Sequence, residues 1–267
     1  MVLILALFAG ASNASRQTKK APPFEPDVGL AGKDVIWVPT PERLVDRMLD
    51  LARITSRDYL VDLGSGDGRT VIAAAKRGTR AHGIEYNPDM VALSRRRAAS
   101  ERVSDKATFE RGDLFETDFS KATVVTMFLL PAINMRLRPK LLEMEPGTRI
   151  VSNTFAMEDW IPDASATIPN CTEWCTALLW IVPAKVEGSW RLTQGELKLT
   201  QRFQIVTGTS SAFGNTTPIT NGKLQGRTIA FTLGATRYTG RVDNTTISGT
   251  STSGRSTSTW QATRAAP

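Results

Sequence analysis

The stretch Asp58–Glu85, DYLVDLGSGDGRTVIAAAKRGTRAHGIE, decides the fold of this 267-residue chain. Its apolar start, residues 59–61, predicts a buried strand of a parallel sheet. A glycine-rich turn follows at 62–68, then 70–76 predicts a helix and 81–84 a second strand. Strand, turn, helix and strand in this order are typical of α/β folds with a mostly parallel sheet.

The turn has the composition of a ligand-binding loop. Gly64, Gly66 and Gly68 let the backbone pass close to a ligand, and the helix that follows points its free N–H groups at the same place. Glu85, about 20 residues further on, is suited to bind the two hydroxyls of a ribose. Asp62 disfavours a pyrophosphate and suits a ligand that carries an ammonium group. The alternative interpretation is a plain structural turn.

Composition and charge limit the other possibilities. The chain is 41% hydrophobic, which is ordinary for a globular protein with a core. Its formal charge of +7 belongs to the part from Lys185 onward, where ten basic residues accompany three acidic ones. This excess either favours an anionic partner or keeps a β module soluble. The basic run 95–97 has no aromatic residues interleaved, so we interpret it as a solvated helix face and expect no nucleic-acid partner.

The cysteine and histidine content excludes several kinds of site. Cys171 and Cys175 are the two cysteines and His82 is the single histidine, too few for a Cys/His zinc cluster; we therefore predict no metal. His82 begins a strand, which argues against a Ser-His-Asp triad. A disulfide between the cysteines needs a turn, so we expect both to be free.

The N-terminus has the features of an export signal. Residues 1–14 contain an apolar run followed by small residues, which predicts a signal peptide or an apolar tail, although no basic residue precedes the run. The run is too short to span a bilayer, which needs about 20 apolar residues. It still allows association with a membrane. Residues 15–33 are rich in proline and polar residues and predict a linker.

Two domains follow the linker. Residues 34–184 alternate strands with helices, and segments 164–168 and 176–182 predict a hairpin that completes a seven-strand, doubly wound sheet. Residues 185–267 contain short alternating runs, including 196–206 and 222–224, separated by Gly, Asn, Ser or Thr. They predict a small antiparallel β-meander, with a weak similarity to calycin-like barrels.

Several motifs together resemble one family. They are VPTP (38–41), DLGSGDGR (62–69), GIEYNP (83–88), GDLFETD (112–118), ATVVTMFLLP (122–131), RPKLL (138–142), PGTR (146–149) and DW (159–160). They are similar to the seven-strand S-adenosylmethionine-dependent methyltransferases, in particular the lysine methyltransferases related to the mitochondrial ATP-synthase c-subunit enzyme and its broad-specificity archaeal relatives.

The resemblance implies a cofactor site for S-adenosylmethionine. It assigns the methionine end to Thr40, the ribose to Glu85, and the adenine to Asp113 and Leu114. The remaining cradle residues are Asp62, Gly64, Ser65, Gly66 and Tyr86.

The acceptor site is expected where the fourth and fifth strands end. Methyl transfer needs alignment and an apolar surrounding that favours a neutral amine. The residues suited to line such a pocket, or equally the core, are Phe128, Leu129, Pro131, Phe155 and Trp160. Two positions depart from the family: Phe128 stands where we expect tyrosine, and Asn153 where histidine is common.

These observations predict a methyltransferase that N-methylates protein lysine. One alternative is a methyltransferase acting on a small molecule. The other is a catalytically inactive cofactor-binding fold with a ligand-binding β module. Export would remove the enzyme from the cytosol, where S-adenosylmethionine is made, so the sequence leaves the location open.

Overall fold

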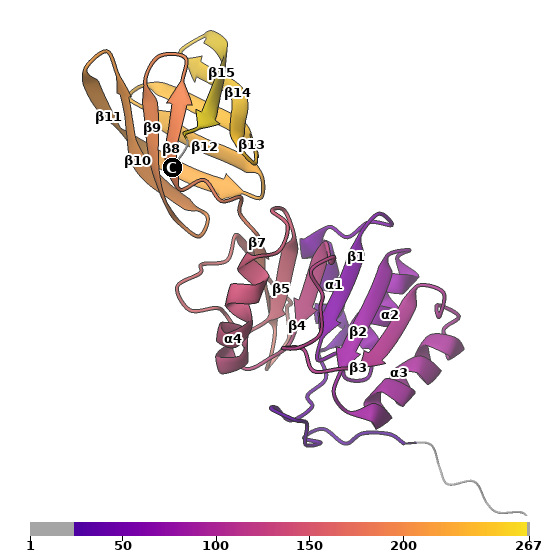
Figure 1. Ribbon diagram of the computed structural model, residues 1–267. Coiled ribbons are helices and arrows are strands. Elements are labelled where there is room, and N and C mark those ends of the chain that lie inside the picture. The colour runs from indigo at the N-terminus through magenta and orange to yellow at the C-terminus, as the bar shows by residue number, and fades with distance from the viewer. Residues whose placement is uncertain (1–23, 266–267) are drawn as a thin grey trace, which may run out of the picture.

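The computed structural model describes residues 24–265 as an α/β domain followed by a β-barrel (Figure 1). The predicted signal segment, residues 1–14, lies outside the described residues. A seven-stranded sheet has the order β3-β2-β1-β4-β5-β7-β6. Its strands are β1 (Tyr59–Leu63), β2 (Arg80–Glu85), β3 (Ala107–Arg111), β4 (Val124–Met127), β5 (Arg149–Asn153), β6 (Ala164–Thr167) and β7 (Thr176–Ile181).

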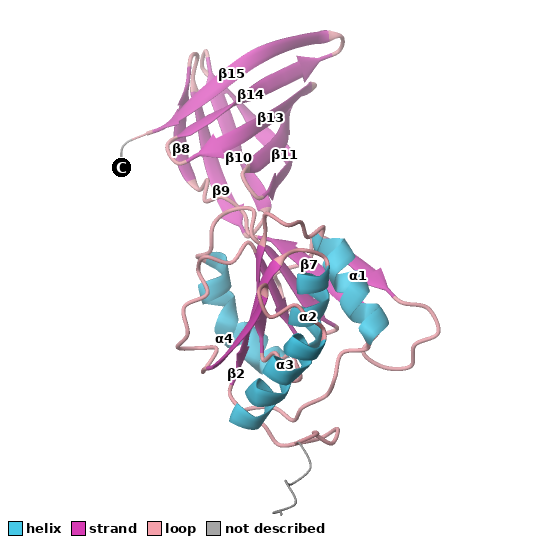
Figure 2. Cartoon of the chain, turned by 90° about the vertical axis from the view of Figure 1, so that its right-hand side faces the viewer, coloured by secondary structure: helices cyan, strands magenta, loops and turns pink. Residues whose placement is uncertain are grey.

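Helices cover both faces of this sheet, as Figure 2 shows. They are α1 (Glu42–Ala52), α2 (Arg69–Lys76), α3 (Pro88–Ser100) and α4 (Pro131–Leu142). Apolar residues of α1, α2 and α3 share one core with the sheet, and those of α4 share a second core on the opposite face. The doubly wound fold predicted from the sequence is confirmed. None of the described helices is long and apolar enough to cross a membrane.

The parallel strands bring their carboxyl ends to one edge of the sheet. Residues 60–63 of β1 pair in parallel with 81–84 of β2 and with 124–127 of β4. The segments that follow these strands therefore meet at one edge, outside a topological switch point where α/β proteins bind ligands. α3 starts there with Asn87, whose side chain accepts a hydrogen bond from the backbone N–H of Asp89.

The β6–β7 connection differs from the sequence prediction. Cys171 and Cys175 form a disulfide, with 5.7 Å between their Cα atoms, so the expectation of free cysteines is wrong. Asn170 and Trp174 have φ values of 53° and 55°. These left-handed residues turn the chain tightly enough for the two sulfur atoms to meet, which an extended segment would prevent.

The C-terminal domain is a closed, eight-stranded antiparallel barrel. Its strands are β8 (Gly188–Leu192), β9 (Glu196–Arg202), β10 (Ile205–Ala212), β11 (Asn215–Gln225), β12 (Thr228–Leu233), β13 (Thr236–Asp243), β14 (Thr246–Ser253) and β15 (Ser256–Arg264). The predicted run 196–206 is in fact β9 and the start of β10, because Phe203 has a positive φ of 52° and turns the chain. The short segment expected at 222–224 is the end of the longer β11.

The barrel meets the α/β domain at the edge where the parallel strands begin. Ile181, the last residue of β7, lies opposite Arg149, the first residue of β5, so the chain leaves the sheet at this edge. The backbone N–H of Ala184 then donates to the carbonyl of Gly226 in the barrel at 2.8 Å. The barrel is consequently remote from the edge where the strands end.

Candidate active site

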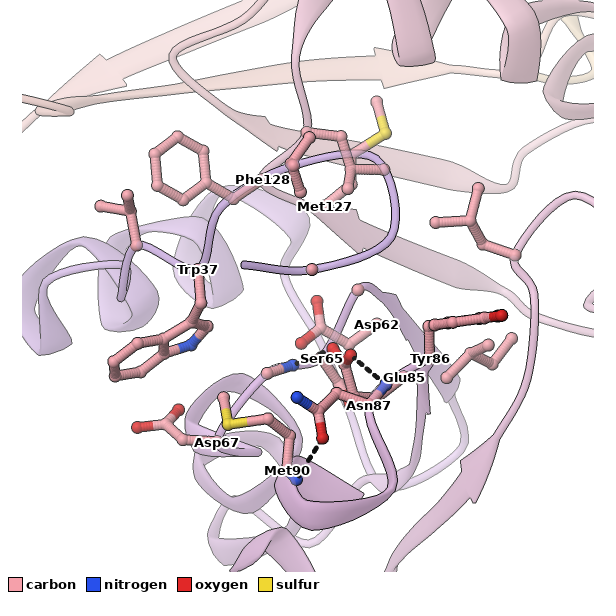
Figure 3. A pocket seen from close by; sticks show the side chains of 18 of the residues that line it. Trp37, Asp62, Ser65, Asp67, Glu85, Tyr86, Asn87, Met90, Met127 and Phe128 are labelled. Carbon is pink, nitrogen blue, oxygen red and sulfur yellow. Dashed lines mark hydrogen bonds between the residues drawn. The ribbon is translucent and has the colours of Figure 1, made fainter. Parts of the chain in front are cut away.

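A cavity opens at the carboxyl ends of β1, β2 and β4, and it is walled on the other side by residues 30–40 (Figure 3). It encloses about 1050 Å³, including space open to solvent. The sequence-predicted residues that line it are Thr40, Asp62, Gly64, Ser65, Gly66, Glu85, Tyr86, Asp113, Leu114, Phe128 and Leu129.

Glu85 faces the glycine-rich turn. Its Oε2 accepts a hydrogen bond from the backbone N–H of Gly66 at 2.9 Å, and its Oε1 accepts one from Asn87 at 2.8 Å. Each carboxylate oxygen retains a further lone pair, which suits it to accept from a pair of hydroxyl groups. Gly66 has φ 53°, and a Cβ there would lie 2.6 Å from Trp37 Nε1. A side chain at position 66 would therefore force Trp37 to move.

Asp62 is the most perturbed acid of the site. Its carboxylate is 6% exposed, and burial raises its pKa to about 7, with smaller contributions from the charges of Asp67 and Glu85. The Thr126 hydroxyl donates to its Oδ1 at 2.6 Å and opposes this rise. A buried carboxylate without a basic partner attracts a cationic ligand group, because an opposite charge restores its ionised form.

Asp67 supports the cavity rather than binding in it. It is 2% exposed and forms ion pairs with Arg69 and Arg97. Burial alone would raise the pKa of Asp67, but the hydrogen bond from Arg69 and the two guanidinium charges outweigh burial and hold it low. Arg69 also donates to the carbonyl of Thr40 at 2.9 Å. Asp67 thus ties the glycine-rich turn to the segment that begins α1.

Residues 30–37 form a loop over the cavity. The backbone N–H of Trp37 donates to the carbonyl of Leu30 at 2.8 Å, and Gly29 donates to the Trp37 carbonyl at 2.9 Å. Lys33 forms an ion pair with Asp113, which holds the pKa of that carboxyl below its usual range. The end of the predicted linker, Leu30 to Lys33, therefore helps to enclose the site.

The residues present fit S-adenosylmethionine. Asp62 is a buried acid that suits the ammonium group of its methionine part, and Glu85 suits the ribose hydroxyls. The Oγ atom of Ser65, within the described part of the chain, is buried without a hydrogen-bond partner. It packs against Gly83 of β2, where an added Cβ would lie 2.5 Å from it. Among residues 24–265 no three His, Cys, Asp or Glu side chains are grouped to hold a metal ion.

Only some of the predicted acceptor residues lie at the cavity. Phe128 and Leu129 line the cavity, and the Phe155 ring packs against Phe128 with 6.0 Å between centroids. Pro131 is exposed at the start of α4. Trp160 is fully buried, and its ring stacks on Phe203 of the barrel connection. We therefore assign Trp160 to the core and leave it out of the acceptor site.

Several residues of the site were missed by the sequence analysis. Trp37, Asp67 and Met90 line the cavity, and Trp174 packs against both Phe128 and Phe155. Asp67 could have been predicted as a site residue, because it lies within the glycine-rich motif. Trp37 and Trp174 lie in loops with no periodic pattern, so only their tertiary position identifies them.

Comparison with known proteins identifies the class to which this site belongs. A family model described as the ANTKMT methyltransferase domain matches residues 62–164. The chain is 44% identical over 131 residues to the protein-lysine N-methyltransferase of Saccharolobus islandicus, covering 48% of this chain and 81% of that protein. It is 40% identical over 128 residues to the human lysine N-methyltransferase of the ATP synthase c-subunit, which it matches over 48% of this chain and 54% of that protein.

A solved structure extends the match to three dimensions. An RNA methyltransferase from Salinibacter ruber, in complex with S-adenosyl-L-homocysteine, is 48% identical, with a TM-score of 0.53. The match covers 56% of this chain and 96% of that one. The fold and the site thus define an S-adenosylmethionine-dependent methyltransferase. The chain belongs to the ANTKMT methyltransferase family, as the sequence motifs predicted. The barrel lies beyond the end of the family model.

Proposed function

We propose that this protein N-methylates lysine side chains of other proteins. Two relatives that are 44% and 40% identical carry lysine methyltransferase names. The observation that carries the proposal is the apolar wall of the cavity at the end of β4, where Phe128 and Leu129 lie beside the cradle formed by Asp62 and Glu85. Such a wall favours an uncharged amine, which is the reactive form of lysine.

S-adenosylmethionine supplies a methyl group on a positively charged sulfur. A bound neutral lysine nitrogen would receive that methyl group through its lone pair, and the electrons of the C–S bond would pass to sulfur. The methylated nitrogen would then carry the positive charge and would release a proton to water. The protein mainly has to position the two reactants, because the leaving group is already activated.

The chain's own residues perform that positioning. Asp62 would hold the amino-acid part of the cofactor, and Glu85 would hold its ribose. The loop 30–37 covers the cavity opposite the glycine-rich turn, and the Lys33–Asp113 ion pair holds it there. Asn153, where relatives commonly have histidine, donates to the Thr40 hydroxyl at 3.2 Å. It thereby orients Thr40 toward the methionine end.

Transfer of a radiolabelled methyl group into the proteins of a bacterial lysate tests the proposal. Label recovered as methyl-lysine after hydrolysis supports it, and the Asp62→Ala variant should abolish the signal. Label that appears only in small molecules would contradict it in favour of a small-molecule acceptor. Binding of S-adenosylmethionine with no acceptor of any kind would favour the inactive cofactor-binding alternative.

RNA is a second candidate acceptor. The observation that favours it is the 48% identity to the Salinibacter protein, which is described as an RNA methyltransferase. The same assay separates the two, because ribonuclease treatment would remove label from RNA and leave methyl-lysine intact.

A further inference from the structure

Three aromatic rings from distant parts of the chain form one cluster. Phe128 follows β4, Phe155 follows β5, and Trp174 lies in the β6–β7 connection. Their ring centroids are 5.3–6.0 Å apart, which is within the range of favourable aromatic pairs. All three side chains are half-buried, and none belongs to the three hydrophobic cores of the described residues. The cluster, Phe128, Phe155 and Trp174, is thus a partly open apolar surface.

This cluster continues the wall of the cofactor cavity. Phe128 lines the cavity and also touches the other two rings. Thr154, next to Phe155, donates its N–H to the carbonyl of Thr176 at 2.7 Å, which holds the end of β5 against the start of β7. The rings therefore lie at the same edge of the sheet as the cradle, on the side of β4 and β5.

No Lys or Arg side chain of the described residues lies over the faces of these three rings. Seven Lys or Arg side chains lie over aromatic rings within residues 24–265, for example Arg264 over Trp190 at 4.3 Å. None of these seven pairs involves the cluster. Ring faces beside a cavity, with no internal cation over them, are suited to receive an ammonium group from outside.

Trp174 is held in the cluster by the disulfide. It occupies the position before Cys175 in the loop closed by Cys171 and Cys175, with a left-handed φ of 55°. A non-glycine residue keeps this conformation only where the surrounding structure imposes it. The loop closed by the disulfide contains this residue, and the indole is directed against Phe128 and Phe155.

We propose that the cluster Phe128, Phe155 and Trp174 is a binding site for the alkylammonium side chain of the methyl acceptor, with Trp174 as its outer wall. This deepens the proposed lysine methylation and rests on it. The ring faces attract the protonated side chain as it enters, and the apolar surface then favours the neutral amine nearer the cofactor. Trp174 is a binding residue that the disulfide-closed loop positions.

A binding measurement tests the site without catalysis. Butyltrimethylammonium, a mimic of a methylated lysine side chain, is titrated by calorimetry onto protein saturated with S-adenosylhomocysteine. We expect saturable binding that Trp174→Ala weakens by about fivefold, that Trp174→Phe largely retains, and that uncharged 1-pentanol does not reproduce. Phe213→Ala, which removes an exposed ring from the barrel, is the matched control and should bind as wild type does.

A second measurement follows methyl transfer at increasing concentrations of lysate protein. Trp174→Ala should raise the half-saturating concentration by about fivefold or more while its affinity for S-adenosylhomocysteine stays within about twofold of wild type. The Cys171→Ser/Cys175→Ser double variant should show a smaller change in the same direction. A conservative Trp174→Phe variant that restores transfer separates binding from a folding defect.

The outcomes distinguish the site from the function. Absence of saturable butyltrimethylammonium binding in wild type, or equal binding in wild type and Trp174→Ala, overturns the site. Methyl-lysine formation that is insensitive to Trp174→Ala also overturns it and leaves lysine methylation standing. Trp174-dependent cation binding with no methylated protein supports the site and overturns lysine as a protein substrate.

Discussion

The two domains of this protein use buried polar groups in opposite ways. At the cofactor edge of the sheet, Asp62 and Ser65 are buried in a cavity wall, one with a raised pKa and the other without a partner. In the barrel the buried side chains are mostly apolar, and the rings of Phe231, Tyr238 and Trp260 pack against one another. A buried acid without a basic partner carries an energetic cost, and at Asp62 it lies where a cationic ligand group can compensate it.

The contact between the domains accounts for part of the barrel's basic charge. Ion pairs join basic residues of the C-terminal part to acidic residues of the α/β domain. They are Lys185–Glu143, Arg202–Asp159, Lys223–Asp163 and Arg227–Glu145. Phe203 stacks on Trp160, with 5.8 Å between centroids. At these four residues, therefore, the basic charge of the C-terminal part pairs with acidic residues of the α/β domain.

The contrast between the two domains predicts that the largest change in cofactor affinity follows from substituting Asp62. Asp62→Ala removes the only acid of the described cradle whose pKa is strongly raised, and we expect the affinity for S-adenosylhomocysteine to fall by about a hundredfold or more. Calorimetry measures the change. Asp159→Ala, which removes a carboxylate at the barrel contact, is the control and should leave the affinity unchanged. Equal losses in both variants would show that the cradle has no special role.

Two glycines with the same backbone conformation give the next test. Gly66 and Gly234 have φ values of 53° and 56°, but a Cβ at Gly66 would meet Trp37 whereas one at Gly234 would meet nothing within 4 Å. Both alanine variants should lose about 1 kcal/mol of stability from backbone strain. Gly66→Ala should in addition weaken cofactor binding by about tenfold. If Gly234→Ala weakened binding as much, the close approach at Gly66 would be irrelevant.

The raised pKa of Asp62 predicts a pH dependence. Ionised Asp62 binds the ammonium group, so below pH 7 the affinity for S-adenosylhomocysteine should fall, by at most about tenfold per pH unit. Stability changes in the opposite sense. The folded protein without ligand retains a proton that an unfolded carboxyl releases near pH 4, so this group's contribution to stability decreases as the pH rises from about 4 to 7.

Calorimetry at several pH values from 5.5 to about 8 measures the first effect, and thermal unfolding measures the second. Asp62→Asn, which does not titrate, is the control. It should bind weakly with an almost flat pH profile. A profile that keeps its slope in this variant would assign the titration to another group.

The smallest effect on the cofactor site is expected from the barrel contact. Phe203→Ala removes the ring that stacks on Trp160 and should lower the Tm by about 3 °C, equivalent to about 1 kcal/mol. The affinity for S-adenosylhomocysteine should change by less than about twofold, because the barrel lies at the opposite edge of the sheet. A large loss of affinity would show that the two edges are coupled.

The sequence by itself determined the α/β domain, its cofactor and the existence of a β module. These features depend on local patterns: an apolar run before DLGSGDGR predicts a strand and a turn, and an acid at Glu85 follows at a fixed distance. In the structure Glu85 contacts the turn, because β1 and β2 pair in parallel and bring the end of β2 beside the residues that follow β1.

Only the tertiary structure decided which residues meet across long stretches of chain. It paired Cys171 with Cys175, brought Trp174 to Phe128, and placed Trp160 in the core against Phe203 instead of in the acceptor site. The physical reason is that such contacts depend on loop conformation and domain packing. A sequence period of two or 3.6 residues reports which face of an element is buried, but not which distant residue covers it.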